Sequence, residues 1–374
     1  MKLKKITAVI LCIALLLLVL TGCGDKNNNE CSDPDCNPDS QPHINFNQAF
    51  ATFKPDTVML RSGDLTISWA DLYVVLYTTV RNLVSSYGME IPWDEDFDGQ
   101  PLAELVLEYS ADEAKSLLTF MYGLEANNFA FTDQELATIS DDLDELIETY
   151  GGKEALIEAL RTDGGFYSFD VFEELFKFEY KVMYLSDRLY GEGAASFPDD
   201  KVAEFAEKNG FLMAMHILRL QYDESDDSPL SYAEEIHSRL AEQKNSSDFV
   251  SIFRGLMNEF SEDEGALHSF PNGYLFQHHD MMPEFSDATA ALEIGGLSGI
   301  VETMYGYHII LRLPLDYEAT PISIASEGIT RSLRQVAATN DFNDLREGWL
   351  NALNVEFTPE FQSLDLATVF QIHQ

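Results

Sequence analysis

Basic residues and cysteines are scarce in this sequence, and each shortage excludes a class of function. Lys and Arg together number 23 against 64 Asp and Glu, which gives a formal net charge of −41 at pH 7. So acidic a surface repels phosphate backbones, and we therefore expect no nucleic-acid partner. Of the four cysteines, only Cys31 and Cys36 lie beyond the first 23 residues. Without a nearby histidine pair, two cysteines do not complete a tetrahedral zinc shell, so we expect no metal.

The amino terminus has the pattern of an export signal. Three lysines precede an apolar run from Ile6 to Leu20. This run is shorter than the roughly 20 residues that span a bilayer comfortably, which favours a signal peptide over residues 1–22. The sequence Leu, Thr, Gly, Cys that ends at Cys23 resembles the lipobox of bacterial lipoproteins. The resemblance implies lipid attachment at Cys23 and a location on the extracytoplasmic face of the cell membrane. The alternative is a signal-anchor helix with an incidental cysteine.

A polar segment follows the signal. Residues 23–56 are rich in Asn, Asp and Pro and show no apolar period, which predicts a flexible tether. Cys31 and Cys36 lie in it, either as a small disulfide or as free thiols. The remaining residues, roughly 57–374, are enough for two domains.

Residues 57–204 are predicted to be mostly helical and to form the first part of one domain. A short hairpin is expected at its start, with strands near 57–61 and 65–67. The next helix should begin at Ser68, with Asp71 as its capping partner. A later helix carries aromatic side chains at helical spacing, which indicates either core packing, the interpretation we favour, or a peptide-binding stripe.

Two further patterns belong to the same domain. Thr132 and Glu135 repeat the capping-box pattern at the start of another helix. Near the carboxyl terminus we expect one helix from about 322 to 353 and an alternating, strand-like segment over 355–361. Residues 317–374 would then complete the helical domain with a helix and a strand.

Residues 205–316 change character and are expected to form a second domain, inserted into the first. The predicted elements are a strand, two amphipathic helices, a strand, a helix and two strands, near 211–220, 236–240, 249–257, 273–276, 283–292, 299–304 and 307–313. This order suits a small α+β domain with a mixed sheet and covering helices. The whole chain is therefore predicted to be of the α+β class.

Two predicted strands of the inserted domain each carry a histidine among aliphatic residues. His216 lies within residues 213–220, and His308 lies within residues 306–313. A buried imidazole needs a hydrogen-bond partner, since an unpaired polar group in a core is costly. If the two strands are neighbours, each histidine can be the partner of the other. This pairing favours an enzyme over a globular domain without a catalytic site.

Five pieces of residues 211–316 resemble, in the right order, the parvulin-type peptidyl-prolyl isomerases. They are His216–Leu218, Phe260–Asp263, Met281–Phe285, Leu292 with Gly296–Ser298, and Val301–Thr303 leading to Gly306–Ile310. The flanking helical segments resemble, less specifically, the chaperone domain of secreted foldase lipoproteins and of their periplasmic chaperone relatives. The resemblance implies a peptidyl-prolyl cis–trans isomerase without cofactor. Its implied partners are unfolded or partly folded secreted proteins with X-Pro bonds.

The resemblance also implies roles for single residues. The catalytic set would be two paired core histidines, a carboxylate beside the prolyl amide and a hydroxyl that bonds toward the histidines: His216, Asp263, Thr303 and His308. Met281 and Phe285 would line the proline pocket. Isomerisation breaks no bond, so it needs no nucleophile or metal, only an apolar slot and a site that favours the twisted amide. Met281 and Phe285 are four apart, which suits one face of a helix start.

Each of these residues has a simpler interpretation. The histidines could act by structure rather than by moving protons, which we favour. Met281 and Phe285 could be ordinary core, and Asp263 lies in an acidic stretch that could be a solvated loop. His278, His279 and Asp280 invite a metal hypothesis, which we reject because adjacent residues rarely converge on one ion.

Two departures from the parvulin pattern affect function. Residues 269–273 replace the usual Gly-rich acidic turn, so Gly273 falls where an aliphatic pocket residue is common, with Tyr274 or Leu275 as compensation. Residues 223–227 are acidic where phosphate-selecting parvulins carry basic residues, so no phosphate selection is expected.

We predict a lipid-anchored foldase that isomerises X-Pro bonds and holds unfolded chains. One alternative is a holdase whose parvulin domain has little or no activity. A less favoured one is a solute-binding lipoprotein, which would need two α/β lobes.

Overall fold

The computed structural model describes residues 43–373, except residues 89, 98 and 223–227. The predicted signal peptide, Cys23, Cys31, Cys36 and the acidic turn at 223–227 lie outside the described residues. Within the described ranges, no helix is both long enough and apolar enough to cross a membrane.

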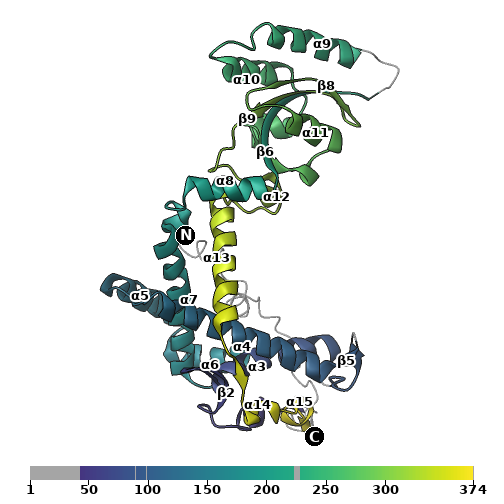
Figure 1. Ribbon diagram of the computed structural model, residues 1–374. Helices are drawn as coiled ribbons and strands as arrows, with labels where there is room; N and C mark the ends of the chain where they lie inside the picture. Colours follow the sequence, from purple (N-terminus) through teal and green to yellow (C-terminus); the bar gives the residue numbers. More distant parts are fainter. Residues whose placement is uncertain (1–42, 89, 98, 223–227, 374) are drawn as a thin grey trace. The chain divides into compact units, whose positions relative to one another are not determined.

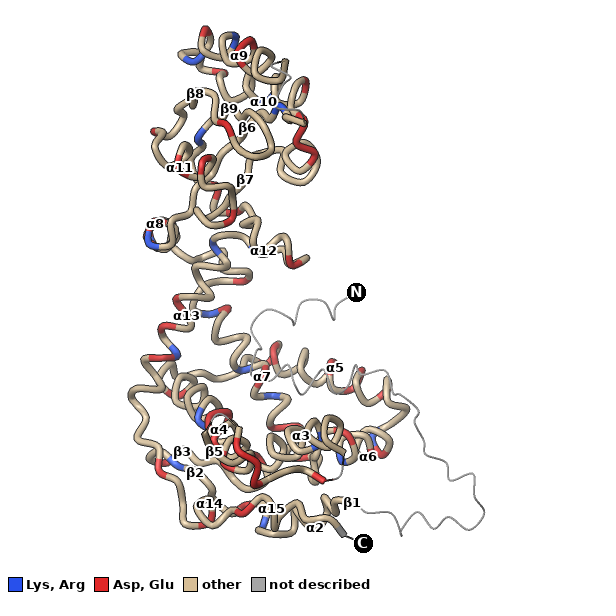
Figure 2. The backbone as a smooth tube through the Cα atoms, turned by 90° about the vertical axis from the view of Figure 1, so that its right-hand side faces the viewer, with Lys and Arg blue, Asp and Glu red and all other residues tan. Residues whose placement is uncertain are grey.

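The chain divides into two compact units (Figure 1). The first unit contains the residues up to Arg188 and those from Phe342 onward, and the second unit is Leu189–Asp341. Asp and Glu occur along the elements of both units, whereas Lys and Arg are few (Figure 2).

The first unit is mostly helical, with small two- and three-stranded sheets. Its helices are α2 (Phe46–Phe50), α3 (Trp69–Tyr87), α4 (Leu102–Ala126), α5 (Asp133–Thr149), α6 (Lys153–Gly164), α7 (Phe169–Tyr190), α13 (Leu333–Ala352), α14 (Pro359–Gln362) and α15 (Leu366–Val369), where α7 and α13 extend into the second unit. Its strands are β1 (His43–Ile44), β2 (Val58–Ser62), β3 (Leu65–Ser68), β4 (Asp96–Phe97), β5 (Gln100–Pro101), β10 (Glu356–Phe357) and β11 (Ile372–His373).

The second unit contains a four-stranded sheet and the elements around it. The elements are η3 (Glu192–Ala194), α8 (Asp199–Lys208), β6 (Phe211–Leu220), α9 (Ser228–Ala241), α10 (Phe249–Phe260), η4 (Gly265–Ser269), β7 (Tyr274–Gln277), η5 (His278–Asp280), α11 (Pro283–Ala291), β8 (Leu297–Thr303), β9 (Gly306–Leu313) and α12 (Ile322–Ser326).

The capping boxes predicted for the first unit are present. The Ser68 hydroxyl accepts a hydrogen bond from the backbone N–H of Asp71, whose carboxylate accepts one from the N–H of Ser68. Thr132 and Glu135 make the same reciprocal pair at the start of α5. The predicted hairpin is also present, as the antiparallel pair of β2 and β3. Local polar signals therefore set these boundaries correctly.

The predicted tether over 23–56 is wrong at its carboxyl end. The side chains of Ile44 and Ala49 are buried in the core of the first unit, with Phe46, Phe50 and Phe53 packed against it. The Trp69 indole and the Tyr73 hydroxyl donate hydrogen bonds to backbone carbonyls of this segment. The apolar side chains of residues 44–53 thus outweigh the polar composition of the surrounding sequence.

The single helix predicted over 322–353 is two helices. α12 ends at Ser326, and Gly328 adopts a φ of +75°, which favours glycine and breaks the helix. Ser332 and Gln335 then exchange side-chain and backbone hydrogen bonds at the start of α13. The strand-like segment over 355–361 is also shorter than predicted, because β10 has two residues and Pro359 starts α14.

The sheet of the second unit has the strand order β7-β6-β9-β8, and all three pairings are antiparallel. The mixed sheet predicted from alternating helices and strands is wrong in this respect. β6 and β7 pair antiparallel across the connection that contains α9 and α10, and β8 and β9 pair as a hairpin. These two helices cover one face of the sheet and α11 covers the other (Figure 1). β6 is therefore buried over most of its length.

The second unit extends beyond the predicted domain of 205–316 on both sides. The Arg334 guanidinium donates hydrogen bonds to the carbonyl of Phe197 and to the carboxylates of Asp199 and Glu318. One side chain thus joins α8, the segment after β9 and the start of α13, all of which belong to the second unit.

Candidate active site

The two histidines lie on neighbouring strands at the centre of the sheet. In the β6–β9 register, His216 faces Ile310 and Leu218 faces His308, so the imidazoles are offset by two residues on one face. The rings are stacked, with 12° between their planes, and the two Nδ1 atoms are 3.0 Å apart. Each residue is only 5% exposed. The pairing predicted from the two strands is present.

Asp263 is brought to the histidines by the edge of β6. β7 pairs only with Phe211–Ala214, which leaves the later part of that edge free. There the Ser261 hydroxyl accepts a hydrogen bond from the N–H of Leu218, and the Glu262 N–H donates to the carbonyl of Leu218. The next residue is Asp263, and its Oδ2 lies 2.6 Å from Nε2 of His216. The solvated-loop interpretation of Asp263 is therefore wrong.

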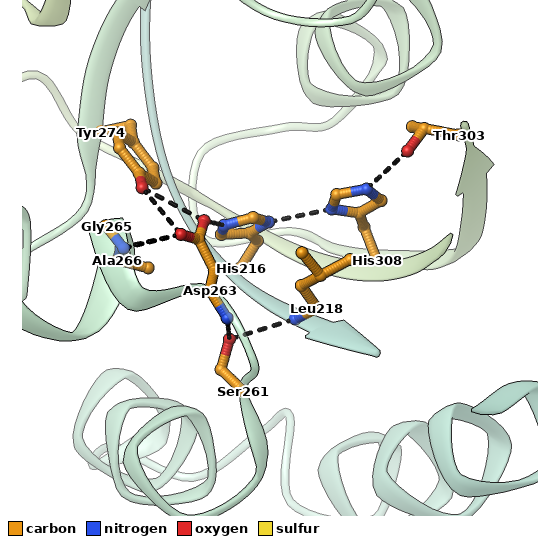
Figure 3. A network of polar contacts seen from close by, with 9 residues as sticks. All are labelled: His216, Leu218, Ser261, Asp263, Gly265, Ala266, Tyr274, Thr303 and His308. Atoms are coloured by element: carbon orange, nitrogen blue, oxygen red, sulfur yellow. Dashed lines mark hydrogen bonds and ion pairs between the residues drawn. The ribbon is translucent and has the colours of Figure 1, made fainter. Parts of the chain in front are cut away.

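The other oxygen of the Asp263 carboxylate is held by backbone and side-chain donors. Oδ1 accepts hydrogen bonds from the N–H groups of Gly265 and Ala266, at 2.8 and 3.2 Å. The Tyr274 hydroxyl contacts both oxygens, at 3.3 and 3.1 Å. Figure 3 shows this cluster of donors on one side of the carboxylate and the imidazole of His216 on the other. The sequence pattern predicts Tyr274 only as a pocket-filling residue, so its hydroxyl contact with Asp263 is not predicted.

These contacts fix the charge of Asp263. Burial alone raises its pKa, but the hydrogen bond and charge of His216, the N–H of Ala266 and the Tyr274 hydroxyl outweigh burial and lower the pKa to about 2. Burial, with the charge and hydrogen bond of Asp263, raises the pKa of Tyr274. The carboxylate is therefore ionised and the phenol is protonated at neutral pH.

Thr303 on β8 completes the chain of polar contacts. Its hydroxyl lies 2.8 Å from Nε2 of His308, as the sequence predicts (Figure 3). Burial first, and then the charge of His216, lower the pKa of His308 to about 3, although Asp263 acts in the opposite direction. His308 is thus neutral at neutral pH and needs one donor and one acceptor.

The proton positions along this series of hydrogen bonds, from Asp263 to Thr303, follow from the ionised carboxylate. A carboxylate only accepts hydrogen bonds, so Nε2 of His216 carries a proton and donates to Asp263. When His216 is neutral, its Nδ1 accepts from Nδ1–H of His308, and the Thr303 hydroxyl donates to Nε2 of His308. When His216 is protonated, both directions reverse. Every ring nitrogen has a partner in either state.

An apolar surface lies directly beside the imidazoles. Phe285 is 3% exposed as a residue, and its ring meets those of His216 and His308 edge to face, with centroids 5.1 and 5.5 Å apart. Met281 lies before α11 in extended backbone, so the prediction that both residues occupy one helix face is wrong. Pro283 begins α11 and excludes Met281 from it. Met281 and Phe285 nevertheless line the same cleft.

The cleft has a volume of about 1390 Å³ and lies entirely within the second unit. Of the predicted catalytic and proline-pocket residues, all except Thr303 line it, and Thr303 lies behind His308. Gly273 also lines it with a φ of +106°, and a Cβ there would lie 2.9 Å from the carbonyl oxygen of Ala214. An aliphatic side chain does not fit at that position, and Tyr274 occupies the adjacent wall.

The histidines after β7 do not form a metal site. His278 pairs with Asp287 and His279 with Asp280, on exposed surface. Among the residues that the structure describes, no group of three or more His, Cys, Asp or Glu side chains could hold a metal ion.

Comparison with known proteins agrees with this geometry. Residues 216–313 match the family model of the PPIC-type PPIase domain, also called rotamase. Over 319 residues the chain is 23% identical to foldase protein PrsA of Clostridium perfringens, which covers 82% of this chain and 87% of that protein. It is 36% identical to foldase protein PrsA 4 of Bacillus cereus over 83 residues, or 22% of this chain and 29% of that protein.

Among solved structures, the chain resembles a crystal structure of a peptidylprolyl isomerase (PrsA) from Bacillus cereus. The identity is 20%, the match covers 82% of this chain and 96% of that one, and the TM-score is 0.30.

The domain match gives the class: residues 216–313 form a PPIC-type domain, and the chain is a peptidyl-prolyl cis–trans isomerase. Over most of its length it resembles the PrsA foldases of Gram-positive bacteria, and it is an extracytoplasmic foldase and chaperone.

Proposed function

We propose that this foldase binds X-Pro segments of unfolded secreted proteins in the cleft of the second unit and isomerises them there. The observation that carries the proposal is the ionised Asp263 carboxylate beside the apolar surface of Phe285 in one cleft. The prolyl ring would pack on Phe285 and Met281. The carbonyl of the preceding residue would then lie beside Asp263 and His216.

In this arrangement Asp263 acts by its charge. A planar amide carries partial negative charge on oxygen, and this charge decreases when the bond twists and resonance is lost. A fixed carboxylate beside the oxygen repels the planar forms more than the twisted one, which lowers the barrier. Phe285 and Met281 supply binding, and His216, His308 and Thr303 hold the carboxylate and each other in place.

A protease-coupled prolyl-peptide assay on the full chain tests this proposal. We expect acceleration over buffer for the native protein and a loss of at least tenfold in kcat/KM for Asp263→Asn, which removes the charge but keeps the shape. Glu264→Gln is the matched control, because Glu264 is adjacent and exposed and its carboxylate pairs with the exposed His268. A rate no faster than buffer for the native protein, or equal rates for the two variants, would refute it.

We also propose that lipid on Cys23 anchors the foldase to the outer face of the cell membrane, with residues 24–42 as tether. The lipobox-like ending at Cys23 supports this. Labelling cells with a palmitate analogue should mark the native protein, and Cys23→Ser should be unlabelled and released into the medium. A membrane-bound, labelled Cys23→Ser protein would contradict the anchor.

The first unit is proposed to hold unfolded chains while the second isomerises them. Several large apolar side chains of its helices are more than a third exposed, namely Tyr87, Tyr109, Leu136 and Ile157. Suppression of aggregation of a denatured test protein should therefore persist in Asp263→Asn. If this variant lost holding and isomerisation together, the two activities would not be separable in this way.

A further inference from the structure

One wall of the active cleft comes from outside the isomerase domain that the comparison matches. The matched residues end at 313, but residues 316–330, including α12, also line the cleft. The lining residues of this segment are Asp316, Glu318, Ala319, Thr320, Ile322, Ser323, Ala325, Ser326, Gly328, Ile329 and Thr330.

This wall is attached to the second unit at both ends. The Asp316 N–H points at Sδ of Met213 at the start of β6, 3.4 Å away. At the other end, the N–H groups of Leu333 and Arg334 donate hydrogen bonds to the carbonyls of Ala319 and Tyr317. The wall is thus part of the built cleft rather than a free linker.

The wall extends the cleft well beyond the space that a proline needs. Pockets for drug-sized ligands measure roughly 300–1,000 Å³, and this cleft measures about 1390 Å³. Tyr305 lies in the turn between β8 and β9, and Asp316 follows the opposite end of β9, so the cleft runs along the strands past the histidines. It has room for several residues of an extended peptide.

The charges that line this cleft have one sign. Four carboxylates line it, namely Asp263, Asp280, Asp316 and Glu318, and the lining residues that the structure describes include no Lys or Arg. The first two are engaged within the site, by His216 and by the N–H of Gln277, and Glu318 pairs with Arg334. Asp316 is exposed, and no cationic side chain in the described part of the chain pairs with it.

We propose that residues 316–330 form a specificity subsite that favours a lysine or arginine within about two residues of the proline, with Asp316 as its principal recognition residue. The inference rests on the proposed function, since it assigns a substrate class to the same cleft. A cationic side chain would lie near Asp316, while the prolyl ring occupies the Phe285 surface. The same carboxylates would repel acidic and phosphorylated segments.

The test compares peptides that differ only in charge. Three peptides carry lysine, its uncharged isostere norleucine, or glutamate two residues before proline, and three carry them two residues after it. Protease-free NMR exchange measures their isomerisation by the full chain. An exposed ion pair contributes about 0.2–1 kcal/mol, so lysine should exceed norleucine by about 1.5- to 5-fold in kcat/KM in one series, mainly through KM.

Two variants locate the effect. Asp316→Asn should lower kcat/KM for the lysine peptide and leave the norleucine peptide unchanged. Glu327→Gln is the matched control, because Glu327 carries the same charge in the same segment but does not line the cleft. Raising the salt to 1 M, where the screening length is about 3 Å, should remove the lysine preference.

The outcomes separate this inference from the proposed function. Isomerisation of all peptides at equal rates, or a lysine preference that Asp316→Asn leaves intact, would overturn the subsite while leaving the isomerase proposal in place. Absence of catalysis for every peptide would instead overturn the proposed function, and the subsite with it.

Discussion

Replacing His308 should remove most of the acid sensitivity of the second unit. In the folded protein, burial and the charge of His216 hold the pKa of His308 at about 3, against an unperturbed value of 6.5. A depressed pKa means that the unfolded chain takes up a proton that the folded chain refuses. The stability contribution is therefore complete above pH 6.5 and is lost as the pH falls toward 3.

The size of this loss follows from the titration window. Between pH 7 and pH 5, the unfolded histidine becomes protonated only over about the last 1.5 pH units, below its pKa of 6.5. Each of these pH units lowers the unfolding free energy by about 1.4 kcal/mol. The free energy of unfolding should thus fall by about 2 kcal/mol over this range. Asp263 does not contribute, because its pKa is about 2 in the folded protein and its model value is 3.8, so it stays ionised throughout.

The assay must observe the second unit by itself. All three tryptophans, Trp69, Trp93 and Trp349, lie in the first unit, so their fluorescence is blind to the second. Hydrogen exchange of β6 and β9 amides in urea, corrected for intrinsic rates, reports its unfolding free energy at pH 7 and pH 5. Fluorescence in the same samples follows the first unit as an internal reference.

His308→Gln should lose about 2 kcal/mol less than the native protein between the two pH values, whatever its stability at pH 7. His279→Gln is the control, because the side chain of His279 is 76% exposed, and it should behave as the native protein does. Equal pH dependence of the native protein and His308→Gln in β6 and β9 would refute the reasoning.

Three further changes test the frame of the site. Thr303→Val leaves Nε2 of His308 without its hydroxyl partner and should lower the unfolding free energy of the second unit by about 1–3 kcal/mol. Thr303→Ser should retain most of that stability. Urea-dependent hydrogen exchange measures both variants. Gly306→Ala places a Cβ against a backbone carbonyl of β6 at a φ of +134° and should lower the unfolding free energy by about 1–3 kcal/mol or more. Gly299→Ala should lower it much less, because no atom lies within 4 Å of its Cβ. Comparable losses of stability in the two variants would show that the backbone at Gly306 does not require glycine. Tyr274→Phe removes a donor to Asp263 and should raise the pKa of that carboxyl from about 2, as a carbon-13 titration would report; an unchanged value would mean that the hydroxyl does not stabilise the charge.

Local and periodic patterns in the sequence predicted the frame of the site. The strands that carry His216 and His308 follow from aliphatic runs, and their pairing follows from the need of buried imidazoles for partners. The role of Tyr274 could not be predicted in this way. Its hydroxyl reaches Asp263 only because residues 261–263 bond to the free edge of β6, which depends on how short β7 is.

The cleft wall formed by residues 316–330 could not be predicted from the sequence for a different reason. Its apolar residues continue the period of the helix that follows, so the pattern predicts one helix. The sequence does contain the break, since Gly328 is followed by Ser332 and Gln335 in a capping-box spacing. The sequence does not show where this segment packs. Its position depends on the ion pairs of Arg334 with Asp199 and Glu318, which join residues far apart in the chain.

The hydrogen bonds that link Asp263, His216, His308 and Thr303 are better understood as stabilising the negative charge of Asp263 than as a path for proton transfer. Isomerisation of a prolyl bond transfers no proton, so a relay would have nothing to carry. The partners of Asp263 instead lower its pKa by about two units from 3.8, which favours the charged form by about 2–3 kcal/mol. Thr303 and His308 act one step further away, since they orient the imidazole that donates to the carboxylate. Loss of the charge at Asp263 should therefore lower kcat/KM by at least tenfold in a folded protein, whereas loss of the Thr303 hydroxyl should lower the stability of the fold more than the rate of isomerisation.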